Sequence, residues 1–125
     1  MSWFNRISES EQKRRKLEQV FAGREPLNDQ QFWSNYFAQH GVALETVVRI
    51  RKIMAEILEA DLSRIRDIDD FSKELNLFWE FDSMAAVELV QALEDEFSIT
   101  ITDTEAEAMK TVKDIVLGVH AKISK

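Results

Sequence analysis

The spacing of apolar residues predicts that most of this chain is helical. Over residues 44–60, apolar residues recur at steps of three or four, which places them on one face of an α-helix. That face consists of Val47, Ile50, Ile53, Met54, Ile57 and Leu58. The same spacing predicts a helix over about 110–123. A short turn of helix around 103–108 is expected to precede it. The polar stretch between about 61 and 80 is expected to be a loop with internal turns.

A second strongly periodic stretch covers residues 83–97. Its apolar residues are predicted to face a core, whereas Glu88, Gln91 and Asp95 fall on a different face of the helix. The predicted inward-facing residues are Met84, Val87, Val90, Leu93 and Phe97. The outer side of this helix is therefore expected to be acidic.

The first 43 residues predict two further helices, of which one covers 8–22. Ser8 and Glu11 stand at the spacing of a capping box, and Gly23 ends the pattern. The apolar stripe of this helix is narrow, since it consists only of Leu17, Val20 and Phe21. Such a stripe anchors a helix weakly, because most helical stability comes from packing of an apolar face.

The other helix of this part extends over 28–40 and can be capped by Asn28 or Asp29. Its aromatic residues recur at i, i+1, i+4 and i+5 and need a surface to cover them. They are Phe32, Trp33, Tyr36 and Phe37. With three glycines and one proline in 125 residues, little interrupts the helices, so the fold class is predicted to be all-α. The length suits one compact core.

Charge is distributed unevenly along the chain. The formal net charge is −7, and residues 80–107 contain nine acidic residues and no Lys, Arg or His. A surface this negative repels phosphate backbones, so nucleic acid is not an expected ligand, whereas a basic patch on a protein is. The alternative is that these acids only keep a helical protein soluble.

The absence of cysteine excludes disulfides, thiolate metal sites and thiol catalysis. It also fits a reducing compartment. The start of the chain lacks the apolar core of a signal peptide, and no uncharged run is long enough to span a bilayer. We therefore expect a cytoplasmic protein.

Ser83 is the one hydroxyl in FDSMAAVELVQALEDEF, residues 81–97. A nucleophilic serine needs a base and an oxyanion hole, but the only histidines, His40 and His120, stand near helix ends without a glycine-rich elbow at Ser83. Neither histidine has a second ligand at i+3 or i+4, so no metal site is expected. Ser83 is therefore either a helix cap or a place where phosphate is held, covalently or not, at a helix N-terminus.

The residues around Ser83 carry a resemblance to a known family. DSMAAVELVQALEDEF, which starts at Asp82, and the following ITITDTEAEAMKTVKDIV resemble the central and final helices of acyl carrier proteins without a gap to about Val116. Upstream, IRKIMAEILEADLSRIRDIDDF, residues 50–71, is similar to the first helix and long loop of the same family.

This resemblance implies a small four-helix bundle, here with one or two additional N-terminal helices. It implies that Ser83, next to Asp82, receives 4′-phosphopantetheine from coenzyme A through a phosphopantetheinyl transferase. The thiol of this arm would carry acyl groups as thioesters in fatty-acid, polyketide or related biosynthesis. The chain would be a monomeric carrier and no enzyme. Basic patches of acyl-transferring or acyl-modifying enzymes would dock on a face that comprises Met84, Glu88, Gln91, Glu94 and Asp95.

Two segments have no counterpart in a minimal carrier of this family. One is an N-terminal helical extension, residues 1–43, which precedes a carrier-like domain, residues 44–125. The other is LFWEF, residues 77–81, which separates Leu75 and Asn76 from the Asp82–Ser83 pair. This altered approach to Ser83 would hinder docking of a transferase, so the alternative function is an unmodified interaction module.

Most aromatic residues lie in these two segments, and exposed they would form a large apolar patch. We expect LFWEF to pack on the helix at 28–40, so that the extension is part of the folded unit. One alternative is that the aromatic residues simply join the common core. Another is that Trp3, Phe4 and the run KRRK at 13–16 touch an anionic membrane surface, although basic and apolar residues do not segregate there.

Overall fold

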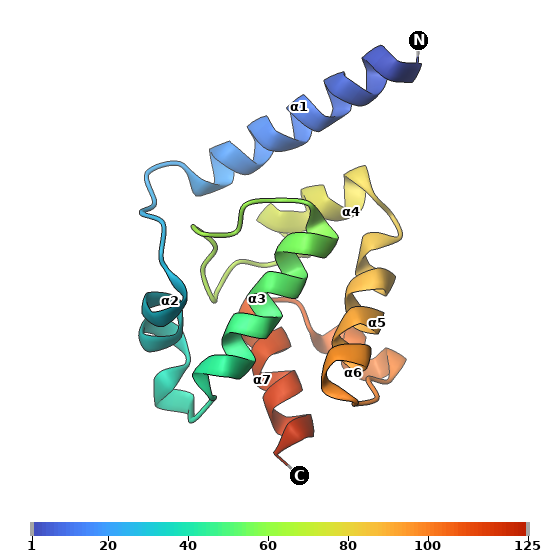
Figure 1. Ribbon diagram of the computed structural model, residues 1–125. Helices are drawn as coiled ribbons and strands as arrows, with labels where there is room; N and C mark the ends of the chain where they lie inside the picture. Colours follow the sequence, from blue (N-terminus) through green and yellow to red (C-terminus); the bar gives the residue numbers. More distant parts are fainter. Residues whose placement is uncertain (1, 125) are drawn as a thin grey trace.

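The computed structural model describes residues 2–124, with side chains from residue 9 onward. Within this part of the chain all regular structure is helical, apart from one isolated β-bridge between Asp70 and Thr111, which confirms the all-α prediction (Figure 1). The α-helices are α1 (Ser2–Phe21), α2 (Asp29–Tyr36), α3 (Leu44–Leu58), α4 (Leu77–Phe81), α5 (Ala85–Phe97), α6 (Asp103–Ala108) and α7 (Val112–Ile123). The 3₁₀ helices are η1 (Ala38–His40) and η2 (Glu74–Asn76).

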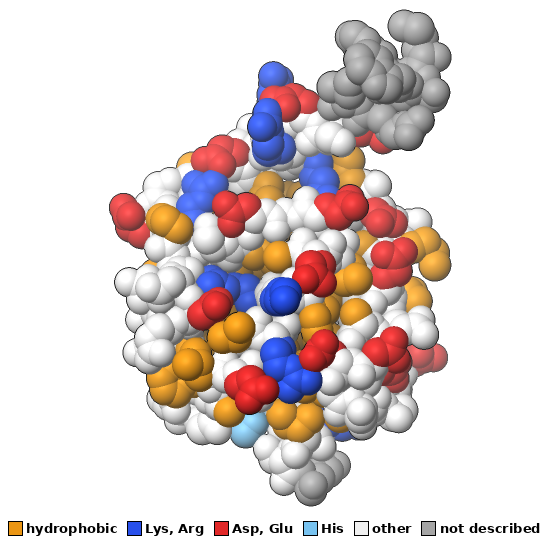
Figure 2. Space-filling model, viewed as in Figure 1, with side chains coloured by type: hydrophobic (Ala, Val, Ile, Leu, Met, Phe, Trp, Pro, Cys, Tyr) orange, Lys and Arg blue, Asp and Glu red, His pale blue; other side chains and the backbone are white. Residues whose placement is uncertain are grey.

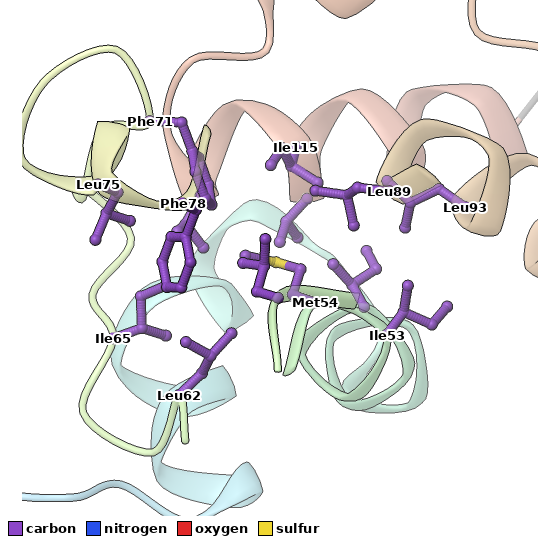
Figure 3. Close-up of a cluster of buried hydrophobic side chains, with 14 of the residues drawn as sticks. Ile53, Met54, Leu62, Ile65, Phe71, Leu75, Phe78, Leu89, Leu93 and Ile115 are labelled. Atoms are coloured by element: carbon purple, nitrogen blue, oxygen red, sulfur yellow. The ribbon is translucent and has the colours of Figure 1, made fainter. Parts of the chain in front are cut away.

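Helices α3, α5 and α7 form the centre of the bundle, and each packs on the other two. Their inner faces meet in one hydrophobic core, and removal of this apolar surface from water drives the packing. Figure 3 shows core side chains of the three helices pointing toward one another: Ile53, Met54, Leu89, Leu93 and Ile115. The predicted helices over 44–60, around 103–108 and over 110–123 are thus present as α3, α6 and α7.

Local hydrogen bonds set several helix starts. Helices α2, α6 and α7 each begin with a capping box, which satisfies backbone N–H groups that lack a partner within the helix. The cap residues are Asn28, Thr102 and Thr111. Asn28 is one of the two caps predicted for its helix. The capping box predicted at Ser8 is wrong, because α1 already begins at Ser2 and no glycine or proline interrupts the first turns.

The buried face of α5 differs from the predicted one. Ala85, Leu89 and Leu93 are buried, whereas Met84 and Val87, expected in the core, are 56% and 58% exposed. The reason is that 84–87 and 89–90 are all apolar, so the apolar surface of this helix extends around much of its circumference. Spacing alone then permits two inner faces, and packing against α3 and α7 selects one of them.

Aromatic residues of the N-terminal extension belong to the same core as the bundle. Phe21, Phe32 and Phe37 are each no more than 1% exposed and join the single cluster of buried residues that also contains Phe78 of α4. For these four rings the arrangement confirms the interpretation that the aromatic residues join a common core. The narrow stripe on α1 also packs inward, since Leu17 is buried as well.

Arginines fasten the extension to the loop that follows α3. The guanidinium of Arg24 donates two hydrogen bonds to the carboxylate of Asp69, at 2.7 and 3.0 Å, and this carboxylate is 1% exposed. The hydrogen bonds to Asp69 raise the pKa of Arg24, although its partial burial acts in the opposite direction. Arg64 pairs with Glu18 and also donates to the backbone carbonyl of Phe21 at 3.3 Å.

Among the helices of residues 2–124, none combines the length and the apolar character that crossing a membrane requires. Trp3 and Phe4, which were considered for contact with a membrane surface, lie outside the described side chains.

Candidate functional site

Ser83 lies in the short turn between α4 and α5 and is exposed. Its neighbour Asp82 ends α4 in an extended conformation. The Oδ1 atom of Asp82 accepts a hydrogen bond from the Met84 N–H at 3.0 Å, and the Asp82 carbonyl accepts one from the Ala85 N–H at 3.1 Å. Asp82 therefore orders the backbone on both sides of Ser83 while Ser83 itself stays accessible.

Ser83 does not cap α5. The helix begins at Ala85, its N-cap position is Met84, and no side chain accepts a capping hydrogen bond there. The helix-cap interpretation of Ser83 is therefore wrong. Asp82 holds the turn instead, in the manner of aspartates that bind the backbone two residues further on.

Helix α4 is the segment LFWEF, and it positions the turn from the other side. It follows directly on η2, and its residues Leu77 and Phe78 are buried. Trp79 stacks on Phe71, with the ring centroids 5.1 Å apart and 24° between the ring planes. Since α4 ends at Phe81, this packing fixes the place from which the Asp82–Ser83 pair projects.

Helix α1 lies over α4, with side chains of both helices in contact. Lys16 forms an ion pair with Glu80 at 3.4 Å, and its Nζ atom lies 5.6 Å from the ring centroid of Phe81. Lys13 approaches the ring of Phe78 to the same distance and donates a hydrogen bond to the backbone carbonyl of Leu58, at the end of α3.

The extension therefore meets the insertion through α1, and the expectation that the helix at 28–40 would pack on it is wrong. Helix α2 packs on α3 instead. The side chains account for this arrangement. The aromatic residues of α2 pack toward α3 and the core, whereas α1 presents lysines that lie over the aromatic rings of α4.

The outer face of α5 combines acidic and apolar side chains. Glu88, Gln91 and Asp95 are exposed, and Met84 and Val87 are exposed beside them. In Figure 2 red and orange side chains are interspersed along the right side of the view, where α5 lies in Figure 1. Four of the five residues predicted for partner docking thus share one surface. Val87 was missed, because spacing placed it in the core.

Glu94 departs from the prediction of a free docking residue. It is half-buried, and its Oε2 atom accepts a hydrogen bond from the Ile101 N–H at 2.9 Å. The neighbouring Glu96 pairs with Arg49 of α3 at 2.7 Å. These two carboxylates are used to fasten the end of α5, which leaves Glu88 and Asp95 as the exposed acids of its outer face.

Two hollows flank the start of α5. An apolar cavity of about 290 Å³ lies between α5, α6, the start of α7, and α4 with the segment before it. Its apolar lining includes Phe71, Trp79, Leu89, Val90, Met109 and Ile115. A groove of about 210 Å³ lies on another side, between α1, the end of α3 and α4, and here the lining is largely polar. It includes Ser10, Lys13, Glu59, Phe81, Asp82 and Ala85.

Sequence comparison identifies a family and individual proteins that are similar to the part of the chain that contains Ser83. Residues 48–118 match the family described as phosphopantetheine attachment site. The chain is 40% identical to an acyl carrier protein of Helicobacter hepaticus over 78 residues, which are 62% of this chain and 97% of that protein. It is 35% identical to an acyl carrier protein of Thermosynechococcus vestitus over 80 residues, or 64% of this chain and 94% of that protein.

Proposed function

Because the chain belongs to the acyl carrier protein family, we propose that Ser83 is the residue to which its 4′-phosphopantetheine arm is attached. The protein is a carrier rather than an enzyme, and it tethers acyl groups on a covalent phosphopantetheine. The arm supplies the thiol that forms the thioester, while this chain supplies the attachment point and the recognition surface. The single observation that carries the proposal is the exposed Ser83 in a turn ordered by Asp82.

The residues around Ser83 fit a phosphate ester. Ser83 is exposed, and the local hydrogen bonds of the turn are made by Asp82. The turn leads into α5, whose N-terminal end favours a negative charge through the helix dipole. In the attachment step, Ser83 Oγ loses its proton to a base of the transferase and attacks one phosphorus of the coenzyme A diphosphate, the one bonded to pantetheine. The bond from this phosphorus to the bridging oxygen breaks, and 3′,5′-ADP leaves with that oxygen.

Intact-mass spectrometry tests the attachment directly. The purified protein is incubated with coenzyme A and a phosphopantetheinyl transferase of broad specificity, and we expect one added phosphopantetheine. Ser83→Ala should abolish the added mass, whereas Ser34→Ala, at another exposed serine, should leave it unchanged. An unmodified protein, under conditions that fully convert an ordinary carrier, would support the alternative of an unmodified interaction module.

Acyl carriers interact with acyl-handling enzymes, and the outer face of α5 is our candidate for that contact. It adjoins Ser83 and presents exposed apolar residues, Met84 and Val87, between the acids Glu88 and Asp95. Apolar side chains supply area for burial, and the carboxylates match a basic patch on a transferase or acyl-transferring enzyme. The predicted monomeric state and cytoplasmic location stay predictions.

Charge reversal tests this docking face. Replacing Glu88 and Asp95 by lysine should lower kcat/KM for modification by the transferase by about tenfold at low salt, because steered association depends on complementary charge. The matched control replaces Glu25 and Glu56, which are exposed elsewhere, and makes the same change in net charge. Equal effects of the two pairs would show that only the net charge matters.

The apolar cavity beside α5 is suited to an apolar acyl chain. Its walls come from Leu89 and Val90 of α5, from Met109 and from the stacked rings of Phe71 and Trp79. A hydrocarbon chain gains free energy when it leaves water for such a lining. We therefore infer that acyl groups with an aliphatic chain fit this carrier.

A further inference from the structure

The groove between α1, the end of α3 and α4 lies directly beside the proposed attachment point. Two of its lining residues, Asp82 and Ala85, stand on either side of the Ser83–Met84 turn. The opposite wall comes from α1, through Ser10 and Lys13. Helix α1 lies outside the segment 48–118 that matches the family, so this wall belongs to the part of the chain that the match does not cover.

Lys13 brings free hydrogen-bond donors into this groove. Its ammonium group donates one hydrogen bond, at 2.6 Å, to the backbone carbonyl of Leu58. A lysine ammonium has three N–H donors, so donors remain for an acceptor inside the groove. The bond to Leu58 and the contact with the Phe78 ring hold the side chain in place, and Lys13 is the one basic residue among those that line the groove.

The remaining walls of the groove combine polar and apolar side chains. Glu9, Glu59 and Asp82 contribute carboxylates, which accept hydrogen bonds, whereas Ile57, Phe78 and Phe81 contribute apolar surface. A plain hydrocarbon would be unfavourable here, because its burial would desolvate these charged groups without compensation. A free phosphate would face three carboxylates against one ammonium group. A ligand with amides, a hydroxyl and methyl groups suits the lining better.

We propose that this groove holds the pantetheine part of the arm attached to Ser83, with Lys13 as a positioning residue that donates to a carbonyl oxygen of the arm. The proposal rests on the attachment at Ser83. Glu9 and Glu59 accept hydrogen bonds from the amide N–H groups of the arm, and the ring of Phe81 contacts its methyl groups. The polar groove thus takes the arm when it carries no acyl chain, and an acyl chain in the apolar cavity would be an alternative state in which the arm has left the groove.

NMR of the fully modified protein tests the docking of the arm. We expect nuclear Overhauser contacts between the methyl groups of the arm and the aromatic protons of Phe78 and Phe81. We also expect changes in the amide shifts of Ser10 and Lys13 relative to the unmodified protein. Contacts of the arm confined to residues of the apolar cavity, such as Met109, would overturn the proposal.

Alkylation of the terminal thiol by a neutral reagent gives a second measurement. An arm docked about two-thirds of the time reacts about threefold more slowly than a free arm, because only the free fraction reacts. Lys13→Met removes the hydrogen-bond donor, and Ser10→Leu fills the groove, so both should restore the faster rate. Arg15→Met and Gln12→Leu, exposed elsewhere on α1, are the matched controls and should not change it.

The two proposals fail in distinguishable ways. An intact mass that never increases overturns both, since no arm is then attached at Ser83. The other outcome is that the protein gains the mass of one phosphopantetheine, but its thiol reacts at the same rate in the original chain and in all four variants. The proposed function then stands, and only the docking of the arm is overturned.

Discussion

Different kinds of contact stabilise the carrier-like bundle and fix the N-terminal extension on it. In the bundle, side chains such as Met54 and Leu93, each 1% exposed, interdigitate between α3, α5 and α7. The extension adds phenylalanines to the same core, but arginines bind it at specific points. Arg51 of α3, for example, donates to the carbonyl of Leu27 at 2.9 Å and to Asp29 at 2.7 Å.

This difference shows how a segment outside the matched region can acquire a defined position. Apolar burial is not directional, so a narrow stripe such as that of α1 leaves the rotation and register of a helix weakly determined. Hydrogen bonds to charged groups have stricter geometry and are stronger than those between neutral groups. The ion pairs of Arg24 and Arg64 with Asp69 and Glu18 therefore supply the orientation that the apolar stripe lacks.

Removal of the extension should have the largest effect. A truncated protein that starts at Ala43 loses three buried phenylalanines and uncovers α4, which corresponds to a loss on the order of 5 kcal/mol or more in the free energy of unfolding. We expect a lower Tm and stronger fluorescence of an apolar dye than for the full chain. An unchanged Tm without added dye binding would identify the extension as a dispensable tail.

A substitution that creates a cavity in the bundle should lower the free energy of unfolding by less than the truncation does. Leu93→Ala is expected to lower the free energy of unfolding by about 3 kcal/mol, because a buried leucine loses its contacts and leaves a cavity. Val87→Ala on the exposed side of the same helix should change it by no more than about 0.5 kcal/mol. Urea unfolding followed by circular dichroism measures both. Equal losses would contradict the inner face of α5 described above.

Breaking one arginine contact of the extension should have a smaller effect still. Arg24→Met removes the charged partner of the buried Asp69 carboxylate, which keeps the hydrogen bond from the Arg66 N–H at 2.7 Å. The free energy of unfolding should fall by about 2 kcal/mol, less than for a fully buried pair because Arg24 is 15% exposed. Arg15→Met, at a side chain that is 75% exposed, should cost no more than about 0.5 kcal/mol.

A double variant separates the pair from general packing. Adding Asp69→Asn to Arg24→Met removes the unpaired charge and should restore part of the lost stability. If the double variant is as unstable as the sum of the two single variants, the two side chains act independently and the proposed clamp is wrong.

The smallest effect is expected at the pair Glu105–Lys122, which links α6 to α7 at 2.7 Å. The hydrogen bond from Lys122 and then that from the Thr102 backbone lower the pKa of Glu105 from its ordinary 4.5 to about 2. This contribution to stability is therefore present above pH 4.5 and is lost as the pH falls toward 2. Lys122→Met should raise the pKa of Glu105 in a carbon-13 NMR titration, and an unchanged pKa would assign the shift to Thr102 alone.

The sequence by itself determined the features that depend on near neighbours. The places of α3 and α7 follow from apolar spacing to within two residues, and the cap of α2 was narrowed to Asn28 or Asp29, of which the structure uses Asn28. The motif DSMAAVELVQALEDEF carried the family, which the comparisons then showed. These features were predictable because helix formation and capping act within one or two turns.

Only the tertiary structure decided which surfaces meet. Both possible inner faces of α5 are apolar, and the choice of Leu89 and Leu93 over Met84 and Val87 depends on what α3 and α7 offer in return. The placement of α1 on α4 likewise rests on contacts such as Lys16 to Glu80, which are 64 residues apart in the chain. These arrangements depend on the packing free energies between distant segments, which the local spacing of apolar residues does not determine.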